Sequence, residues 1–159
     1  MNKKAFSLVE LMVAVAIIAL LAAISIPNYF KYIAKAKQTE VMTNLVALHT
    51  AQLLHFAESG KYSSKLSGEE SIDWQPGGYK KDGENNFYYT YGFNVPGSQE
   101  GVSYFIGKQK TPKDKLGSTL ANETSFIASA ACDLRGKGKI DVWTIDENRN
   151  IKHVQDGLK

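Results

Sequence analysis

The N-terminal part of the chain contains one long apolar segment. Between Phe6 and Ile26, 18 of 21 residues are apolar, and neither proline nor glycine interrupts the segment before Pro27. About 20 apolar residues suffice to span a bilayer as a helix, which satisfies all of its own backbone hydrogen bonds there. The pattern therefore predicts a membrane-spanning helix over residues 6–26. Glu10 is the one charged residue within it and is costly there unless it reaches the interface or meets a cation.

Apolar residues continue beyond Pro27 with a helical period. They recur at intervals of three, four or eight positions, at Phe30, Ile33, Val41, Leu45, Leu48 and Phe56. Polar side chains take most of the other positions, so residues 27–58 are predicted to form an amphipathic helix that lies on a soluble domain. Ser59-Gly60 supplies a stop signal. Pro27 lacks the N–H that a helix interior uses, so we expect a kink there.

After residue 59 the pattern becomes that of loops and strands. Residues 60–86 are rich in Gly and Ser and carry the turn signals Pro76-Gly77-Gly78 and Asn85-Asn86, so they predict a loop, which Trp74 and Tyr79 are expected to anchor. Aromatic residues alternate with smaller ones over 87–93, which predicts a strand with one aromatic core face. Other strands are predicted at 101–107, 125–131, 140–145 and 150–154, with a polar connection at 108–123 and a hairpin turn at 146–149. Sequential strands favour an antiparallel sheet of four or five strands with the amphipathic helix on one face, an α+β fold.

Composition and charge exclude several classes of protein. The 159 residues are enough for one domain, and a net charge of +3 without a run of Lys or Arg gives no signature of sequence-specific nucleic-acid binding. The single cysteine, Cys132, excludes an internal disulfide and a cysteine-based zinc site, and we expect it to be buried. No nucleophile–base pair or glycine-rich phosphate loop is present. The sequence therefore predicts neither an enzyme nor a resident cofactor.

Two groups of residues are candidate metal ligands. His49, His55 and His153 are widely spaced, and the two on the helix do not share a face well, so they predict no metal site. The segment 133–141 carries acids and glycines, but lysines occupy positions where a calcium loop alternates its acids. We predict no metal site and keep Asp133 and Asp141 as an alternative pair of calcium ligands.

The N-terminal residues resemble the leader junction of type IV pilins and pseudopilins. The matching features are Lys3-Lys4, the junction Ala5-Phe6-Ser-Leu-Val-Glu10-Leu, the apolar segment, and Ile26-Pro27-Asn-Tyr29. More loosely, residues 126–134 followed by 141–146 resemble the C-terminal region of type IVa pilins. The lone Cys132 departs from the many pilins that close a C-terminal loop with a disulfide, so the hairpin and Trp143 are expected to hold the tail.

The resemblance implies a pilin ladle fold and a route of maturation. Residues 1–5 would be a leader, residues 6–58 the helix and residues 59–159 the head. A prepilin peptidase would cleave between Ala5 and Phe6, Phe6 would be N-methylated, and Glu10 would pair with the Phe6 amine of an adjacent subunit. Removal of the leader deletes two lysines and reduces the net charge to +1. The implied location is the bacterial inner membrane for the precursor, then an extracellular filament of identical subunits, with an assembly platform and motor ATPases acting indirectly.

Two alternatives stay open at the level of the sequence. A pseudopilin of a type II secretion system shares the same N-terminal pattern, and a C-terminal calcium site would favour it. A signal peptide cleaved after Ser25 would instead release a periplasmic binding protein or enzyme that begins at Ile26.

Overall fold

A computed structural model describes residues 6–159, and the chain divides into two compact units, residues 1–35 and 36–159. The helix α1 (Leu8–Ser59) contributes to both units. It begins two residues after the predicted start and ends one residue after the predicted end. Gly60 ends it in a left-handed conformation, φ 73°, with its N–H bonded to the Phe56 carbonyl at 2.8 Å. Pro27 lies inside α1.

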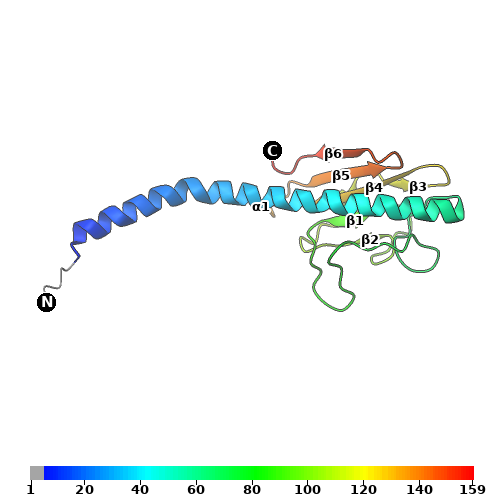
Figure 1. The fold of residues 1–159 in the computed structure, drawn as a ribbon, viewed down its shortest axis with the longest axis horizontal. Helices are drawn as coiled ribbons and strands as arrows, with labels where there is room; N and C mark the ends of the chain where they lie inside the picture. The colour runs from blue at the N-terminus through cyan, green and yellow to red at the C-terminus, as the bar shows by residue number, and fades with distance from the viewer. Residues whose placement is uncertain (1–5) are drawn as a thin grey trace. The chain divides into compact units, whose positions relative to one another are not determined.

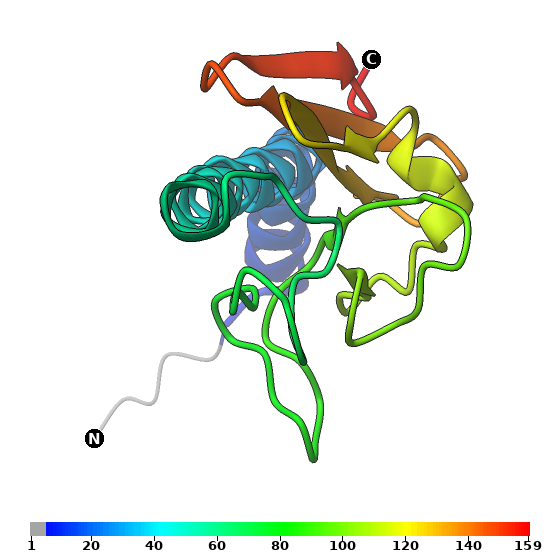
Figure 2. The same ribbon diagram turned by 90° about the vertical axis from the view of Figure 1, so that its right-hand side faces the viewer.

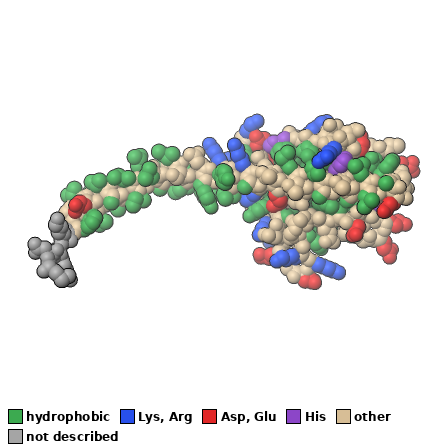
Figure 3. Space-filling view, viewed as in Figure 1, with side chains coloured by type: hydrophobic (Ala, Val, Ile, Leu, Met, Phe, Trp, Pro, Cys, Tyr) green, Lys and Arg blue, Asp and Glu red, His purple; other side chains and the backbone are tan. Residues whose placement is uncertain are grey.

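In the first unit, α1 presents apolar side chains to its surroundings, as Figure 3 shows in green. Every large hydrophobic side chain from Leu8 to Ile26 is more than half exposed. By length and composition, this helix is able to cross a membrane. Ala and Leu account for nine of the residues from Leu8 to Ile26 and favour the helical conformation.

The second unit is built on an antiparallel sheet in the order β2-β1-β4-β5-β6 (Figure 1). The strands are β1 (Thr90–Gly92), β2 (Tyr104–Phe105), β3 (Leu120–Ala121), β4 (Phe126–Cys132), β5 (Asp141–Asp146) and β6 (Ile151–Gln155). Strand β4 pairs with β5 along one edge, while β1 and β3 share its other edge. A short 3-10 helix, η1 (Lys113–Leu116), precedes β3.

The core of this unit lies between the sheet and the part of α1 that belongs to it. Figure 2 looks along that part of the helix and shows it beside the sheet. Val41, Leu45 and Leu48, at the predicted helical spacing, are fully buried. The predicted aromatic face is confirmed, since these four side chains are also fully buried: Phe87, Tyr89, Tyr91 and Phe93.

The predicted strand at residues 87–93 is too long, because its N-terminal part bonds to groups outside the sheet. The Tyr88 N–H donates to the Glu40 carboxylate at 3.0 Å, and the Phe87 carbonyl accepts from the Lys108 N–H at 2.8 Å. Strand β1 therefore comprises only three residues. The predicted strand at 101–107 is likewise reduced to two residues, β2.

The predicted polar connection at residues 108–123 is wrong for Leu120 and Ala121, because these two residues form strand β3. The turn that follows explains the pairing. The Asn122 side-chain oxygen accepts the N–H groups of Thr124 and Ser125 at 2.9 and 2.8 Å, which reverses the chain toward β4. The described residues thus form six strands, where four or five were predicted.

Two other predictions about loops and turns are confirmed. Trp74 is buried and packs edge-on against Phe105, and Tyr79 packs against the same ring with centroids 4.8 Å apart. The β5–β6 turn forms at the predicted place, where the Asp146 carboxylate accepts the N–H of Asn148 at 3.0 Å.

Candidate functional site

The N-terminal end of α1 is closed by a reciprocal pair of hydrogen bonds between Ser7 and Glu10. The Ser7 N–H donates to Glu10 Oε2 at 2.9 Å, and the Glu10 N–H donates to Ser7 Oγ at 3.2 Å. Ser7 stands immediately before Leu8, the first helical residue, and this is the arrangement of a capping box. The two side chains satisfy backbone donors that would otherwise lack partners in an apolar segment.

The sequence predictions do not include this cap, although the sequence contains its signal. A Ser or Thr followed three residues later by Glu, just before an apolar run, marks a helix start. The anomaly of Glu10 therefore has a local explanation as well as an intermolecular one. Within its own chain the carboxylate meets a backbone N–H, which is a hydrogen-bond donor rather than a cation.

The predicted processing site is covered only in part. Ala5 lies outside the described residues, so the cleavage position stays a prediction. Phe6 is 79% exposed and precedes the helix. Its methylation, its pairing with Glu10 of another subunit and the kink at Pro27 also stay predictions.

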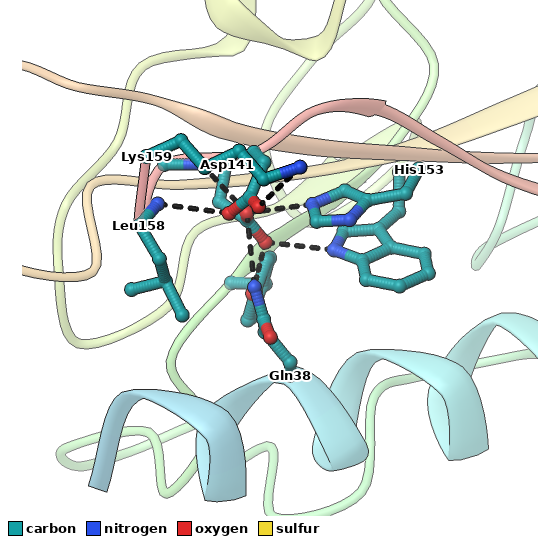
Figure 4. A network of polar contacts seen from close by, with 9 residues as sticks. Gln38, Asp141, His153, Leu158 and Lys159 are labelled. Atoms are coloured by element: carbon teal, nitrogen blue, oxygen red, sulfur yellow. Dashed lines mark hydrogen bonds and ion pairs between the residues drawn. The ribbon is translucent and has the colours of Figure 1, made fainter. Parts of the chain in front are cut away.

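In the second unit, the most densely bonded side chain is that of Asp141, the first residue of β5 (Figure 4). The side chain is fully buried. Its Oδ1 accepts from Gln38 of α1 at 3.2 Å, from His153 of β6 at 2.8 Å and from the Gly157 N–H at 2.9 Å. Its Oδ2 accepts from the Tyr89 hydroxyl at 2.6 Å and from the Trp143 indole N–H at 2.7 Å. One carboxylate thus joins the helix, the sheet and the C-terminal segment.

These bonds control the ionisation of the Asp141 carboxyl. Burial opposes the charged form, but the hydrogen bonds from Tyr89, Gly157, His153 and Trp143 outweigh it and hold the pKa of Asp141 below its usual value. The pKa of Tyr89 is raised, first by burial and then by its bond to this carboxylate. The ionised carboxylate is therefore a stabilising part of the folded state.

Asp133, the other calcium candidate, belongs to a different network. Its carboxylate accepts the Lys137 and Gly138 N–H groups at 3.1 and 2.7 Å. Around Asp141 the groups close enough to share an ion are His153 and Asp156. Asp156 also accepts the Leu158 N–H at 2.9 Å and lies 3.6 Å from the Lys159 ammonium (Figure 4). Calcium binding by Asp133 and Asp141 stays an alternative that nothing in the structure tests.

The histidines and the cysteine have structural surroundings. His153 stacks on Trp143 with ring centroids 3.9 Å apart, which fits the expectation that Trp143 holds the tail. His49 is buried and lies 3.1 Å from the Glu147 carbonyl, whereas His55 is half-buried elsewhere on α1. Cys132 is buried as predicted, and burial raises the pKa of its thiol to about 12.

Comparison with known proteins matches both the N-terminal segment and the whole chain. Residues 1–26 match the prokaryotic N-terminal methylation motif. The type IV major fimbrial protein FimA of Dichelobacter nodosus is 30% identical over 163 residues, covering 99% of this chain and 96% of the relative. The type IV major pilin protein PilA of Myxococcus xanthus (strain DK1622) is 55% identical over 62 residues, covering 39% of this chain and 28% of the relative. The prepilin peptidase-dependent protein D of Escherichia coli (strain K12) is 39% identical over 71 residues, covering 45% and 49%.

Proposed function

This chain belongs to the type IV pilin family, and we propose that it is the repeating structural subunit of a pilus filament. The precursor is anchored in the bacterial inner membrane by residues 6–26, cleaved after Ala5 by a prepilin peptidase and N-methylated on Phe6. The subunits then polymerise through their N-terminal helices into an extracellular fibre. Platform proteins and motor ATPases drive assembly, and the chain itself has a structural rather than an enzymatic role.

The observation that carries the proposal is the exposure of the apolar helix in the first unit. The surface of Leu8–Ile26, where every large hydrophobic side chain is more than half exposed, is not stable in water. Lipid covers it in the precursor, and neighbouring helices cover it in a filament. Transfer from lipid to a helix bundle gains little hydrophobic free energy, so close packing and polar contacts must select the arrangement.

Glu10 supplies the polar contact. Cleavage after Ala5 creates an α-amine at Phe6, four residues before the carboxylate. A carboxylate and an ammonium are each costly in an apolar bundle and tolerable as a pair, and the pair forms at one stagger of neighbouring subunits. In the monomer, the Glu10 carboxylate accepts a hydrogen bond from the Ser7 N–H. To pair with the amine of a neighbouring subunit, the carboxylate must either give up this hydrogen bond or accept both donors at once.

Mass spectrometry of the N-terminal peptide from purified fibres tests the maturation steps. The proposal expects N-methylphenylalanine at position 6. An N-terminus at Ile26 would identify a secreted protein and refute the proposal, as would the absence of the chain from fibres and normal piliation after deletion of the gene.

Two variants separate the charge pair from the cap. Glu10→Gln keeps an oxygen for the Ser7 N–H but removes the charge, and loss of a buried pair partner costs about 3–5 kcal/mol, so filament yield should fall by far more than tenfold. Ser7→Ala removes one cap bond, worth about 1 kcal/mol, and should leave filaments present. Immunoblots of sheared fibres measure both. A filament yield from Glu10→Gln as high as that from Ser7→Ala would show that assembly does not need the charge of Glu10.

A further inference from the structure

Four cationic side chains meet at one pocket of the second unit. The pocket has a volume of about 370 Å³ and is lined by Arg135, Lys137, Lys139, Gly157, Leu158 and Lys159. No run of basic residues marks this pocket in the sequence, because glycines separate three of the cations along one loop and Lys159 comes from another segment. We call this the basic pocket.

Hydrogen bonds hold both segments that form the basic pocket. The Asp133 carboxylate accepts the Lys137 and Gly138 N–H groups, and these bonds hold its pKa below its usual value against the opposing effect of burial. On the other segment, the Gly157 N–H donates to Asp141 at 2.9 Å. The Lys139 ammonium donates to the Lys159 main-chain oxygen at 2.7 Å and ties the two segments together. The cations are therefore presented by an ordered scaffold rather than by a loose tail.

Few salt bridges of the described residues involve the cations of the basic pocket. Among the salt bridges of residues 6–159, just one involves a lining residue, Lys159 with Asp156 at 3.6 Å, and that ammonium is 87% exposed. Exposed pairs of this kind contribute little. Asp133 and Asp141 direct their oxygens to backbone and side-chain hydrogen-bond donors, and neither forms a salt bridge with a side chain that lines the pocket. No lining residue is acidic.

We propose that the basic pocket binds phosphate groups. The Arg135 guanidinium can contact two phosphate oxygens at once, and Lys137 and Lys159 add point charges around the same concavity. A concave patch of one charge sign concentrates counter-ions locally even when the whole chain is nearly neutral. The phosphate is either a free dianion or the phosphodiester of a nucleic acid, bound without regard to base sequence.

The test uses NMR spectra of the isotopically labelled full chain in uncharged detergent micelles. Inorganic phosphate is titrated first and a single-stranded oligonucleotide second, each at low ionic strength. The expected result is a saturable shift of the amide signals of residues 135–139 and 157–159. Binding should weaken at high salt, because exposed charges are screened.

Paired charge-reversal variants distinguish a pocket from general electrostatic attraction. Arg135→Glu with Lys137→Glu should weaken binding by at least about tenfold, since charge-assisted contacts are lost and repulsion replaces them. Lys80→Glu with Lys81→Glu makes the same change of net charge in an exposed loop and should leave affinity within about twofold. Both variants change exposed residues, and an unchanged urea midpoint verifies folding.

Each outcome has one meaning. Shifts with inorganic phosphate identify a site for the free dianion, and shifts with the oligonucleotide alone identify polymer-borne phosphate. Absence of local shifts with both ligands overturns the proposal. Equal weakening by the two variant pairs also overturns it, because bulk charge would then explain the binding.

Discussion

Replacement of the buried Asp141 carboxylate by an amide provides a direct test of its structural role. Asp141→Asn preserves the shape of the side chain but leaves one oxygen where there were two. If that oxygen takes the Oδ1 position, the Tyr89 hydroxyl and the Trp143 indole N–H lose their acceptor. If it takes the Oδ2 position, three donors lose theirs instead.

The expected loss of folding free energy follows from the orientation that leaves fewer donors, two, without an acceptor. Each buried donor left without a partner costs about 1–3 kcal/mol, so two donors cost roughly 2–6 kcal/mol. Removal of the charge also removes its desolvation cost, but this gain does not compensate, because the lowered pKa shows that the site favours the ionised form. A working value of about 3 kcal/mol, with a slope of about 1.5–2 kcal/mol per M, lowers the urea midpoint by roughly 1.5–2 M.

Urea unfolding of the full chain in detergent micelles, followed by tryptophan fluorescence and circular dichroism, measures this shift. Asp114→Asn is the matched control: it makes the same chemical change at a carboxylate that is 62% exposed and pairs with Lys115 at 3.0 Å. Exposed pairs of this type contribute about 0–1 kcal/mol, so the control midpoint should move little. If the two variants unfold at the same urea concentration, the assignment of Asp141 as the central bonded group is refuted.

Three further predictions concern pH, a thiol and a glycine. Folding lowers the pKa of the Asp141 carboxyl, so the carboxylate stabilises the fold at pH values above its unfolded pKa of about 3.9 and loses this effect as pH falls through its folded pKa. The stability of Asp141→Asn should therefore depend less on pH in the acid range than that of the parent chain. The Cys132 thiol, with its pKa raised to about 12, should react with iodoacetamide at pH 8 roughly a thousandfold more slowly in the folded chain than in urea, and rates within tenfold of each other would contradict its burial. Gly92→Ala should destabilise the folded domain strongly, because a Cβ on residue 92, whose φ is 131°, would lie 2.3 Å from the Ser103 carbonyl oxygen. Gly97→Ala is the control: a Cβ there enters open space at a φ of 80°, and the substitution should cost about 1 kcal/mol of folding free energy. Urea midpoints measure both effects.

Secondary structure could be predicted from the sequence wherever it depends on residues that are close along the chain. The helical period after Pro27 correctly predicts the buried positions Val41, Leu45 and Leu48, whereas Phe30, Ile33 and Phe56 of the same pattern are exposed. The β-forming runs predict β4, β5 and β6 nearly to their ends. The Ser7–Glu10 cap is equally local, because its signal lies within four consecutive residues. The lengths of β1 and β2 could not be predicted in this way, since the Glu40 carboxylate, far away in sequence, takes the N–H of Tyr88.

By itself, the sequence determined that an apolar helix with a single carboxylate leads into an α+β domain, because composition and periodicity depend on each segment alone. Only the tertiary structure decided that Asp141 collects five donors, from α1, β5, β6 and the segments before β1 and after β6. It also decided that Arg135 and Lys159 line one pocket. The physical reason is that a hydrogen bond or a field of charges depends on distance in space. Nothing in the spacing of Gln38, Tyr89 and Asp141 along the chain encodes that distance until the sheet and helix have packed.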